Sequence, residues 1–563
     1  MVSRLTQSFS FHSSPESFIS SRLEQFTLSD GDSLPFASRI VKAQILNREV
    51  HIVTSYHACK AILCHQSRTN DPVEERRADG GEYASEYADV YAHERTSKDG
   101  ASPQRSRKCT VHARNSNRSH DKPELFAARA AYRQFMGDFF PGPNLLLEDG
   151  LAHRIHKDQW RTRLLNLPQS SESLIREITQ SRFLDQLVGG QNPQEIDLYA
   201  HLKSLIWDIL FGVFLSITRN GDGSKFHRLE ELQEALLRGQ FSTFPVSIST
   251  PLWSSARSRG IDAVKELEKS LGTVARDVLA SKASDRSFNA CPFSEQLREA
   301  GLPSDDHLDA EDVISHLRLF TSSIANKALA SLLTAFILNL FVWRPSSSMT
   351  NSGHGSGTSV SLAELIRSYP DPQKRVIMLQ SVLAETERLS PPVVGVMRRV
   401  QQDVLISSAD RDRPEEYAIP GGQDAWLYLS GANRDPDVYD RAGEFVWDRF
   451  LPSFSTSTKD TVNADVPSTD FQPPLPFAFG DGIKSCLGAD LSRQICLTVA
   501  YTLVDKSIMM AGRIDEGGVV AWLGWERRMD RKDEVQLMAR DLKQLPTQRP
   551  RRAVKVQVGR QTK

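Results

Sequence analysis

Residues 476–489 read PFAFGDGIKSCLGA and decide the fold prediction. The stretch places one cysteine, Cys486, in a loop with three glycines, and the apolar spacing of a buried helix follows it. Gly480, Gly482 and Gly488 let the backbone turn sharply and approach a bound group closely. The stretch therefore predicts a thiolate that ligates a metal. The alternative is a buried cysteine in a glycine-rich turn.

Two further side chains of this stretch suit a metal-bound thiolate. Lys484 can place positive charge near a thiolate or near an anionic cofactor edge, and Phe479 can cover one side of the sulfur. The pattern resembles the cysteine-ligand loop of the cytochrome P450 family, Phe-Gly-x-Gly-x-Arg-x-Cys-x-Gly, with Lys484 in place of the arginine. This resemblance implies haem b with Cys486 as the iron ligand. It also implies a cofactor-binding set of Phe479, Gly480, Gly482, Lys484 and Gly488.

A second motif of the same family precedes the loop. Glu385 and Arg388 stand three positions apart at the end of a helical pattern, so they share one helix face. On a surface such a pair would contribute little stability. The resemblance implies instead a buried structural network of Glu385, Arg388 and Arg449, the last from the stretch Trp-Asp-Arg-Phe.

The resemblance also implies cations that hold the haem propionates. Trp160 and Arg163 lie in the expected helix, although the usual Trp-x-x-x-Arg spacing is absent because Leu164 follows Trp160 by four. His153 is a weaker candidate. A further cation is Arg398 or Arg399, and we favour Arg399.

The pattern at 309–343 predicts one long apolar helix. In the P450 family, the long central helix lies over the distal face of the haem and carries an acid-alcohol pair. Here Ile324 stands where the acid is expected and Ala325 where the alcohol is expected. Ala325 and Asn326 are our candidate distal residues, with Asn326 as a substitute hydrogen-bonding group.

Taken together, the resemblance implies a mainly α protein with small β-sheets, an α+β cytochrome P450 fold with haem between the long helix and the cysteine loop. Alternating apolar runs at 35–53 predict a β-hairpin. The charged stretch 68–123 lacks periodicity and predicts a disordered insertion, or mistranslated intron sequence. The predicted organisation is an N-terminal extension at 1–34, one domain at 35–555 with that insertion inside it, and a tail at 556–563.

Composition excludes some classes of function. The 563 residues carry a net charge of −1, which argues against a nucleic-acid binder. The six cysteines form no C-x-x-C pair, so we expect an intracellular, reducing compartment, cytoplasmic or at a membrane surface. No run of about 18 apolar residues occurs, so we expect no transmembrane anchor. We also expect a monomer.

The stretch 241–253 is rich in aromatic and apolar residues, including Phe241, Phe244, Leu252 and Trp253. It could line a lipophilic pocket, form a membrane-facing lip, or pack in the core. The sequence leaves these three alternatives open.

The function that the resemblance implies first is a monooxygenase that hydroxylates or epoxidises a lipophilic small molecule in secondary metabolism. Too few residues follow Cys486 for a flavodoxin-like domain, so a separate NADPH-dependent flavoprotein reductase would supply electrons. The alternative is a haem-thiolate enzyme that does not activate O₂, namely a peroxygenase, a hydroperoxide isomerase or a dehydratase. Ile324 and Ala325, which cannot deliver protons, favour this alternative. A catalytically inactive haem-binding protein is a third possibility, against which the intact cysteine loop argues.

Overall fold

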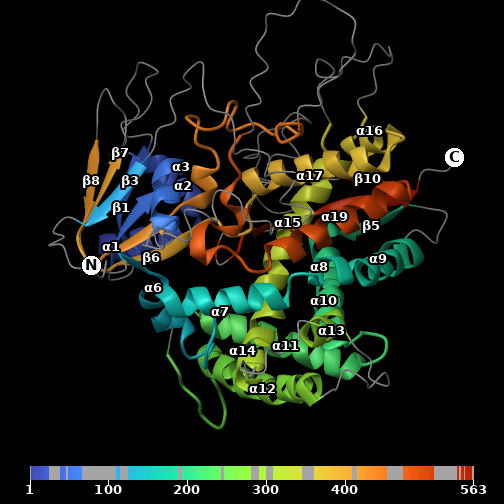
Figure 1. Cartoon of the computed structure of the whole chain (residues 1–563), viewed down its shortest axis with the longest axis horizontal. Helices are drawn as coiled ribbons and strands as arrows, with labels where there is room; N and C mark the ends of the chain where they lie inside the picture. Colours follow the sequence, from blue (N-terminus) through green and yellow to red (C-terminus); the bar gives the residue numbers. More distant parts are fainter. Residues whose placement is uncertain are drawn as a thin grey trace, which may run out of the picture.

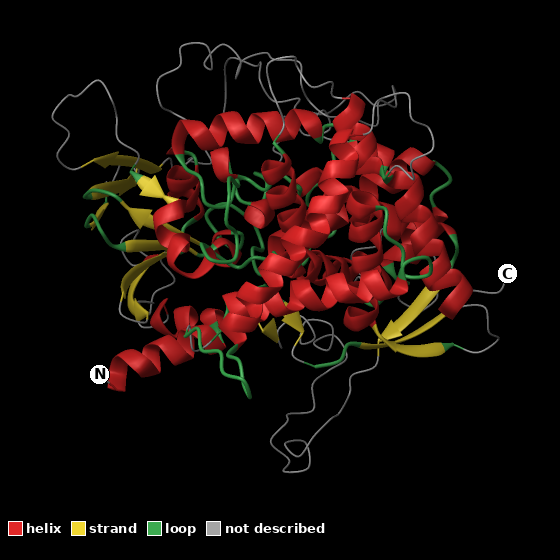
Figure 2. Ribbon diagram, turned by 90° about the horizontal axis from the view of Figure 1, so that it is seen from below, coloured by secondary structure: helices red, strands yellow, loops and turns green. Residues whose placement is uncertain are grey.

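A computed structural model shows how the chain is arranged. The residues that it describes are 2–23, 39–45, 48–65, 109–113, 125–187, 193–242, 246–280, 291–299, 309–344, 360–408, 415–452, 473–512, 542–543, 545, 547–550 and 552–560. Helices fill the middle of the molecule, and most strands lie at its two ends, with a few short strands below the helices (Figure 2).

Four long helices form the centre of the helical body. They are α10 (Leu198–Leu215), α15 (Ser323–Phe341), α17 (Pro372–Leu389) and α19 (Ala489–Asp505). α10 and α15 are apolar on almost every face, which is the composition of a helix buried on all sides. α15 runs through the body and contacts α10, α17 and α19 (Figure 1). The predicted α+β fold class, with helices dominant, is confirmed.

The long central helix is interrupted, so the prediction of one helix at 309–343 is wrong. α14 (Ala310–Phe320) ends before Thr321, and α15 begins at Ser323. Ser322 has an extended backbone, with ψ of 152°, and its hydroxyl accepts a hydrogen bond from the amide of Ala325. This N-cap satisfies an amide that a continuous helix would bond internally, so the sequence restarts the helix instead of continuing it.

Shorter helices surround this centre. They are α1 (Val2–Ser13), α2 (Pro15–Leu23), α3 (Tyr56–Leu63), α6 (Ala128–Met136), α7 (Gly150–Arg163), α8 (Leu167–Ser170), α9 (Glu172–Gln180), η4 (Ser181–Asp185), α11 (Gly223–Gln240), α12 (Ala256–Ala280), α13 (Pro292–Glu299), α16 (Leu362–Ser368) and α18 (Leu429–Ala432).

A five-stranded sheet lies at one end of the helical body (Figure 1). Its strand order is β1 (Ile40–Ile45), β2 (Arg48–Val53), β9 (Asp424–Leu427), β6 (Val396–Val400) and β4 (Phe126–Ala127). β1 and β2 are antiparallel, with Ile40 opposite Val53, so the predicted hairpin is confirmed. β2 and β9 are parallel, which places the N-terminal hairpin beside a strand from the last third of the chain.

The predicted insertion at 68–123 extends too far. β3 (Cys109–Ala113) pairs antiparallel with β7 (Val404–Ser408), which also pairs with β8 (Glu416–Ile419). Five residues are too few to show a period in the sequence, and they are a strand only because β7 offers them its free edge. The remainder of 68–123 lies outside the described residues.

Both ends of the chain belong to the domain, which corrects the predicted extension and tail. Phe11, Phe18 and Ile19 are buried against the five-stranded sheet in one apolar cluster. At the other end, β13 (Lys555–Arg560) pairs with β10 (Ile508–Gly512) and β5 (Gln194–Asp197). A small ladder joins β11 (Leu542–Lys543) to β12 (Arg549–Pro550).

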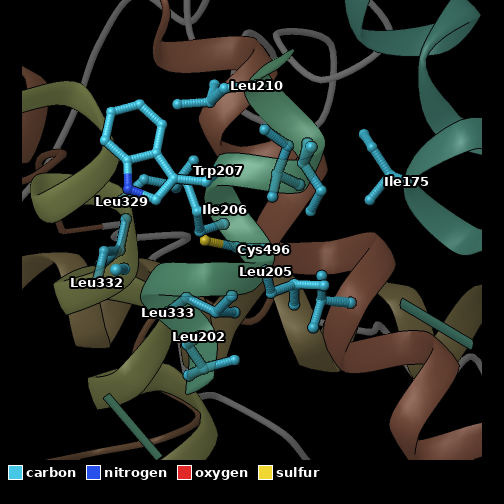
Figure 3. Packing of buried hydrophobic residues seen from close by; sticks show 14 of the residues in the cluster. Ile175, Leu202, Leu205, Ile206, Trp207, Leu210, Leu329, Leu332, Leu333 and Cys496 are labelled. Atoms are coloured by element: carbon cyan, nitrogen blue, oxygen red, sulfur yellow. The ribbon is translucent and has the colours of Figure 1, made fainter. Parts of the chain in front are cut away.

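The largest apolar cluster lies where α10, α15, α9 and α19 meet (Figure 3). α10 contributes Trp207, α15 contributes Leu332, α9 contributes Ile175 and α19 contributes Cys496, and all four are buried. Burying a side chain of the size of Leu or Ile stabilises the folded state by about 1.5–3 kcal/mol. Cys496 therefore packs in the core.

Two stretches, 198–215 and 310–341, are long and apolar enough to cross a membrane by composition. In the folded chain, 72% and 61% of their most apolar windows are buried inside the protein. The second stretch is also divided by the break at Thr321 and Ser322. Both stretches therefore behave as core helices of this fold.

Candidate active site

The cysteine loop connects two short 3₁₀ turns, Phe477–Phe479 and Gly482–Lys484, to the start of α19. The amide of Cys486 donates to the carbonyl of Phe479 at 2.8 Å, which closes the loop. Gly480 and Gly482 have φ of 74° and 66°, in the left-handed region that favours glycine. A Cβ on Gly482 would also overlap the carbonyl oxygen of Leu63 in α3.

Cys486 is accessible to solvent although it lies deep in the protein. Its residue surface is exposed, yet burial raises the pKa of its thiol. Gly488 lies next to the sulfur. A Cβ added to Gly488 would be in van der Waals contact with Sγ, at 3.9 Å, so the glycine leaves that side of Sγ uncovered. The hydrogen bond from Gly488 favours the thiolate form of Cys486.

The three predicted network residues are brought together and buried. Glu385 is held by a two-point contact with Arg388, at 2.7 and 2.8 Å, and by Arg449 at 3.1 Å. Its Oε1 also accepts from the amide of Val446 at 2.9 Å. Each arginine would be an unpaired buried charge without this carboxylate.

The network reaches the cysteine loop through one asparagine. Arg388 donates to the carbonyl of Asn433 at 3.0 Å, and the Oδ1 of Asn433 accepts from the amide of Phe477 at 2.8 Å. Asp371 caps the N-terminus of α17 and Pro372 occupies its first turn, and both residues stabilise the start of the helix. Glu385 and Arg388 lie near its C-terminal end. The network therefore positions the start of the loop.

Trp160 and Arg163 point from α7 toward α14. Trp160 is buried and stacks on His316, with ring centroids 4.3 Å apart. Arg163 lies over the Trp160 ring at 5.4 Å and within 4.0 Å of Asp312. Both residues therefore contact the distal helix, and the cysteine loop is contacted by other residues of α7.

Two residues of α7 reach the cysteine loop: His153, the weaker candidate from the sequence, and Lys157, which was not a candidate. His153 Nε2 lies 3.1 Å from the carbonyl oxygen of Ile483. Lys157 Nζ donates to that carbonyl at 2.8 Å and to the carbonyl and hydroxyl of Ser485 at 2.7 and 2.9 Å. They stand four positions apart, as the family's Trp and Arg do, but both residue types are replaced. The spacing was the available signal.

The space between α7 and the cysteine loop favours an anion. Burial lowers the pKa of Lys157 to about 8 and that of His153 to about 3, and nearby Lys484 lowers the pKa of His153 further. Among the described residues, no carboxylate lies within ion-pair distance of Lys157. A negatively charged group placed here would reverse both shifts.

Lys484 and Arg399 are both engaged. Lys484 forms an ion pair with Asp149 at 3.2 Å and donates to the carbonyl of Glu148, which ties the loop to the start of α7. Arg399 forms an ion pair with Asp424 at 2.6 Å inside the five-stranded sheet. The neighbouring Arg398 is buried beside Tyr132.

On the distal side, the polar groups of α15 are turned toward neighbouring helices. Asn326 donates through Nδ2 to the carbonyl of Lys203 in α10 at 3.0 Å. Lys327 pairs with Glu234 of α11 at 2.7 Å. Ile324, Ala325 and Ala328 remain half-buried in the first turns of α15. The partly accessible surface there is apolar.

Comparisons with known proteins agree with this arrangement. Residues 370–505, which include Glu385, Arg449 and Cys486, match the family model described as Cytochrome P450. The chain carries a cytochrome P450 domain. A retinoic acid-bound cyanobacterial CYP120A1 structure has a TM-score of 0.56 at 17% identity, over 97% of this chain and 95% of that one. A cytochrome P450SP alpha structure has a TM-score of 0.52 at 15% identity, over 98% of each chain.

Curated relatives are similar over short segments. Allene oxide synthase 3 of Oryza sativa is 30% identical over 118 residues, and allene oxide synthase 2 of Solanum lycopersicum is 35% identical over 118 residues. A divinyl ether synthase of Allium sativum is 28% identical over 221 residues. These segments cover 21%, 21% and 37% of this chain and 22%, 21% and 42% of the relatives.

The cytochrome P450 family binds haem b, and the residues present fit this cofactor. Cys486 offers an accessible sulfur beside Gly488 at the end of a loop whose glycines allow close approach. The cationic region formed by Lys157 and Lys484 suits carboxylate groups.

Proposed function

We propose that this P450 converts an organic hydroperoxide of a lipophilic substrate, as a hydroperoxide isomerase or dehydratase, without activating O₂. The observation that carries the proposal is the apolar start of α15, where Ile324, Ala325 and Ala328 are half-buried. Asn326 and Lys327 are instead engaged by α10 and α11. We therefore favour a haem-thiolate enzyme that does not activate O₂ over the monooxygenase that the resemblance of the cysteine motif implies first.

Cys486 is the proposed iron ligand, and the Gly480, Gly482 and Gly488 loop holds it. Lys157, Lys484 and His153 are the proposed partners of the haem propionates, in place of Trp160 and Arg163. When bound, the haem supplies an iron centre that cleaves O–O bonds, which an axial thiolate favours. Phe479, with Arg493 4.8 Å from its ring centroid, shields the loop on the side of α19.

The apolar first turns of α15 suit a hydroperoxide better than O₂. O₂ must be reduced by two electrons and protonated before its O–O bond breaks, whereas a hydroperoxide arrives with that bond already reduced. In a dehydration the O–O bond and one C–H bond of the substrate break and a new C–O bond forms. The distal OH leaves as water with the proton from that C–H bond, so no external electron is needed. Ile324 and Ala325 would then exclude water from the reacting carbon.

The names of the curated relatives support the same class of reaction. The relatives are named allene oxide synthases and a divinyl ether synthase, so their names describe the formation of an epoxide or an ether instead of a hydroxylation. The similarity covers less than half of each relative, so the support concerns the class of reaction. The substrate we propose is a long-chain, fatty-acyl hydroperoxide.

A monooxygenase that receives electrons from a separate NADPH-dependent reductase is the second candidate. One observation favours it: Glu234 joins Lys203 at 2.8 Å and Lys327 at 2.7 Å in a half-buried chain of ionisable groups that ends on α15. Burial opposes the ionisation of Glu234, but hydrogen bonds from both lysines outweigh it and lower its pKa to about 2. Such a chain could carry protons to the distal side.

The test supplies haem-loaded protein with either a fatty-acid hydroperoxide alone or NADPH, a reductase and O₂ with the parent fatty acid. We expect hydroperoxide consumption under anaerobic conditions and no hydroxylated product in the second mixture. Ala325→Thr should change the product ratio, and Ala335→Thr, further along the same helix, serves as the matched control. Tightly coupled NADPH-dependent hydroxylation in the native protein would contradict the proposal.

A further inference from the structure

Two histidines and a carboxylate gather where α7 meets α14 (Figure 1). His156 comes from α7, and Asp312 and His316 stand four positions apart on α14, so they share one face of that helix. One nitrogen or oxygen of each of these three side chains lies within 4.8 Å of those of the other two. Two imidazoles and a carboxylate are a common set of protein ligands for transition metals.

His156 is oriented as a metal ligand would be. Its Nδ1 lies 2.7 Å from the carboxylate of Glu148, and its Nε2 lies 2.8 Å from Oδ1 of Asp312. Histidines that bind metals usually donate the N–H of one ring nitrogen to a carboxylate or carbonyl, which fixes the ring and aims the other nitrogen at the metal. Glu148 therefore fixes the ring of His156, and Nε2 and the Asp312 Oδ1 are the candidate ligand atoms.

His316 brings a buried lone pair that no described group satisfies. Its side chain has no exposed surface, and its Nδ1 donates to the carbonyl of Asp312 at 2.9 Å. The lone pair of the neutral imidazole is then on Nε2, which has no hydrogen-bond partner among the residues that the structure describes. A buried polar atom without a partner is unfavourable, and it often marks the position of a water or an ion.

The charges around Asp312 favour a cation at this place. The carboxylates of Asp312 and Glu148 lie on two sides of the His156 ring. Arg163 approaches the other oxygen of Asp312, Oδ2, at 4.0 Å, which is too far for a hydrogen bond and leaves Oδ1 to His156. The side chains of His156 and Asp312 are 15% and 13% exposed. A cation and one water ligand can therefore reach this edge of the site.

Aromatic rings cover the site on the side of His316. Trp160 stacks on His316 with ring centroids 4.3 Å apart, and the Phe320 ring lies 5.8 Å from it. An apolar surrounding limits the access of water and strengthens the attraction between a cation and its ligands. The rings also hold His316 in place, so that metal binding would not have to order this side chain.

We propose that His156, Asp312 and His316 bind a zinc ion that joins α7 to α14. Zinc takes three such ligands and a water in a tetrahedral arrangement. It would replace the proton between His156 Nε2 and Asp312 Oδ1 and move these atoms from 2.8 Å to about 3.3 Å apart, since each bond to zinc is about 2.0–2.1 Å long. Magnesium and calcium prefer oxygen ligands, so the two imidazoles select against them.

The zinc ion would fix the helix that also carries the proposed partners of the haem propionates. His153 and Lys157 of α7 contact the cysteine loop, whereas His156 on the same helix contacts α14. A metal at this contact would hold α7 between the two sides of the haem site. Its role is therefore structural, and it takes no part in the reaction.

The test measures zinc bound to the haem-loaded full chain by equilibrium dialysis, after treatment with EDTA and removal of the chelator. Haem-loaded protein is used because a free Cys486 thiolate would itself bind zinc. We expect one tightly bound zinc ion per chain, no comparable binding of Mg²⁺, and a Tm that rises by about 3 °C or more with zinc in excess. Asp312→Asn and His316→Gln, made separately, should each weaken zinc binding by about a hundredfold or more.

Two further variants make the test specific. Glu148→Gln leaves all three ligands in place and should weaken zinc binding by about tenfold to a hundredfold, so it tests the site even where a ligand variant does not fold. His227→Gln is the matched control, because His227 is 59% exposed and lies 3.8 Å from Glu230 as another histidine-carboxylate pair. This control should bind zinc as the native protein does.

Three results would overturn the proposal. The first is a native protein that binds no zinc ion, and the second is equal binding of Mg²⁺ and zinc. The third is zinc binding that the ligand variants and the control share with the native protein, since the metal would then be on the surface. None of these measurements depends on the reaction catalysed.

Discussion

The two sides of the proposed haem site differ in how they are built. On the side of the cysteine, the loop is closed by local bonds and held by Glu385, a carboxylate with no exposed surface. On the side of α14 and α15, the helix breaks at Thr321 and Ser322, and its polar groups contact α10 and α11. The first side is rigid around one chemical task, whereas the second is assembled from contacts between distant segments.

This difference indicates where variation in function is tolerated. A metal ligand must be held at one position, so the glycines and the buried network leave few substitutions that fold. The distal helix needs only to present a surface to the substrate, and α15 forms with Ile324 and Ala325 at the positions where the family resemblance predicts an acid and an alcohol. The type of reaction can therefore change on α15 while the cysteine loop stays the same.

The largest expected effect comes from removing the ligand itself. Cys486→Ala should abolish the red-shifted, thiolate-type Soret band of the ferrous-CO complex, because no other sulfur of the described chain lies in the loop. The measurement is the CO difference spectrum of purified protein. Cys496→Ala, which removes a core thiol from α19, should keep the band. A Cys486→Ala protein that retained it would end the assignment of the ligand.

The next effect tests whether the network is structural. Glu385→Ala should lower the free energy of unfolding by about 3–5 kcal/mol, since it leaves Arg388 and Arg449 as buried charges without their carboxylate. Denaturant unfolding and the yield of soluble haem-loaded protein measure this loss. Glu444→Ala is the control, because that side chain is 64% exposed. Normal yield and stability of Glu385→Ala would show that the cysteine side tolerates change as the distal side does.

The cysteine side was also the more predictable one. Cys486 lies among three glycines, and Glu385 and Arg388 are three positions apart. In both cases the residue types and their spacing within a short segment are enough to predict the local geometry. The break at Ser322 was missed because a serine within an apolar pattern competes with the helix only through its own capping bond. β3 was missed because its five residues form a strand only beside β7, which lies far along the chain.

The α7 residues fall between these two cases. The family pattern is a Trp and an Arg four positions apart, and the tryptophan of this helix, Trp160, packs on α14. His153 and Lys157 keep the spacing with both residue types changed. Residue type thus points to Trp160 and Arg163, which contact α14, whereas helical spacing points to His153 and Lys157, which contact the cysteine loop.

A smaller effect distinguishes the two faces of α7. Lys157→Ala should lower haem affinity by about tenfold to a hundredfold, since a hydrogen bond to a charged group contributes about 1.5–3 kcal/mol. Arg163→Ala should leave haem affinity unchanged and affect only stability, because Arg163 contacts Trp160 and α14. Transfer of haem to apomyoglobin measures the affinity. The reverse order of the two variants would restore Arg163 as a propionate partner.

The smallest effect tests whether the two sides are coupled. His156 lies between Glu148 at 2.7 Å and Asp312 of α14 at 2.8 Å, and the carbonyl of Glu148 accepts from Lys484 of the cysteine loop. Burial lowers the pKa of His156, but the hydrogen bonds to Asp312 and Glu148 outweigh burial and raise it to about 9. Arg163 and His316 are the other titratable groups that face this carboxylate pair.

Because the folded-state pKa is above the ordinary value of 6.5, charged His156 stabilises the fold fully below pH 6.5 and loses this contribution as the pH rises through 9. His156→Ala should therefore cost about 1–2 kcal/mol at pH 6, discounted for solvent screening, and almost nothing at pH 10. Thermal unfolding of both proteins at the two pH values measures this, with His227→Ala as the control, since His227 is 59% exposed. A cost that does not change with pH would mean that His156 acts through packing alone. The link between the cysteine loop and α14 would then not depend on its charge.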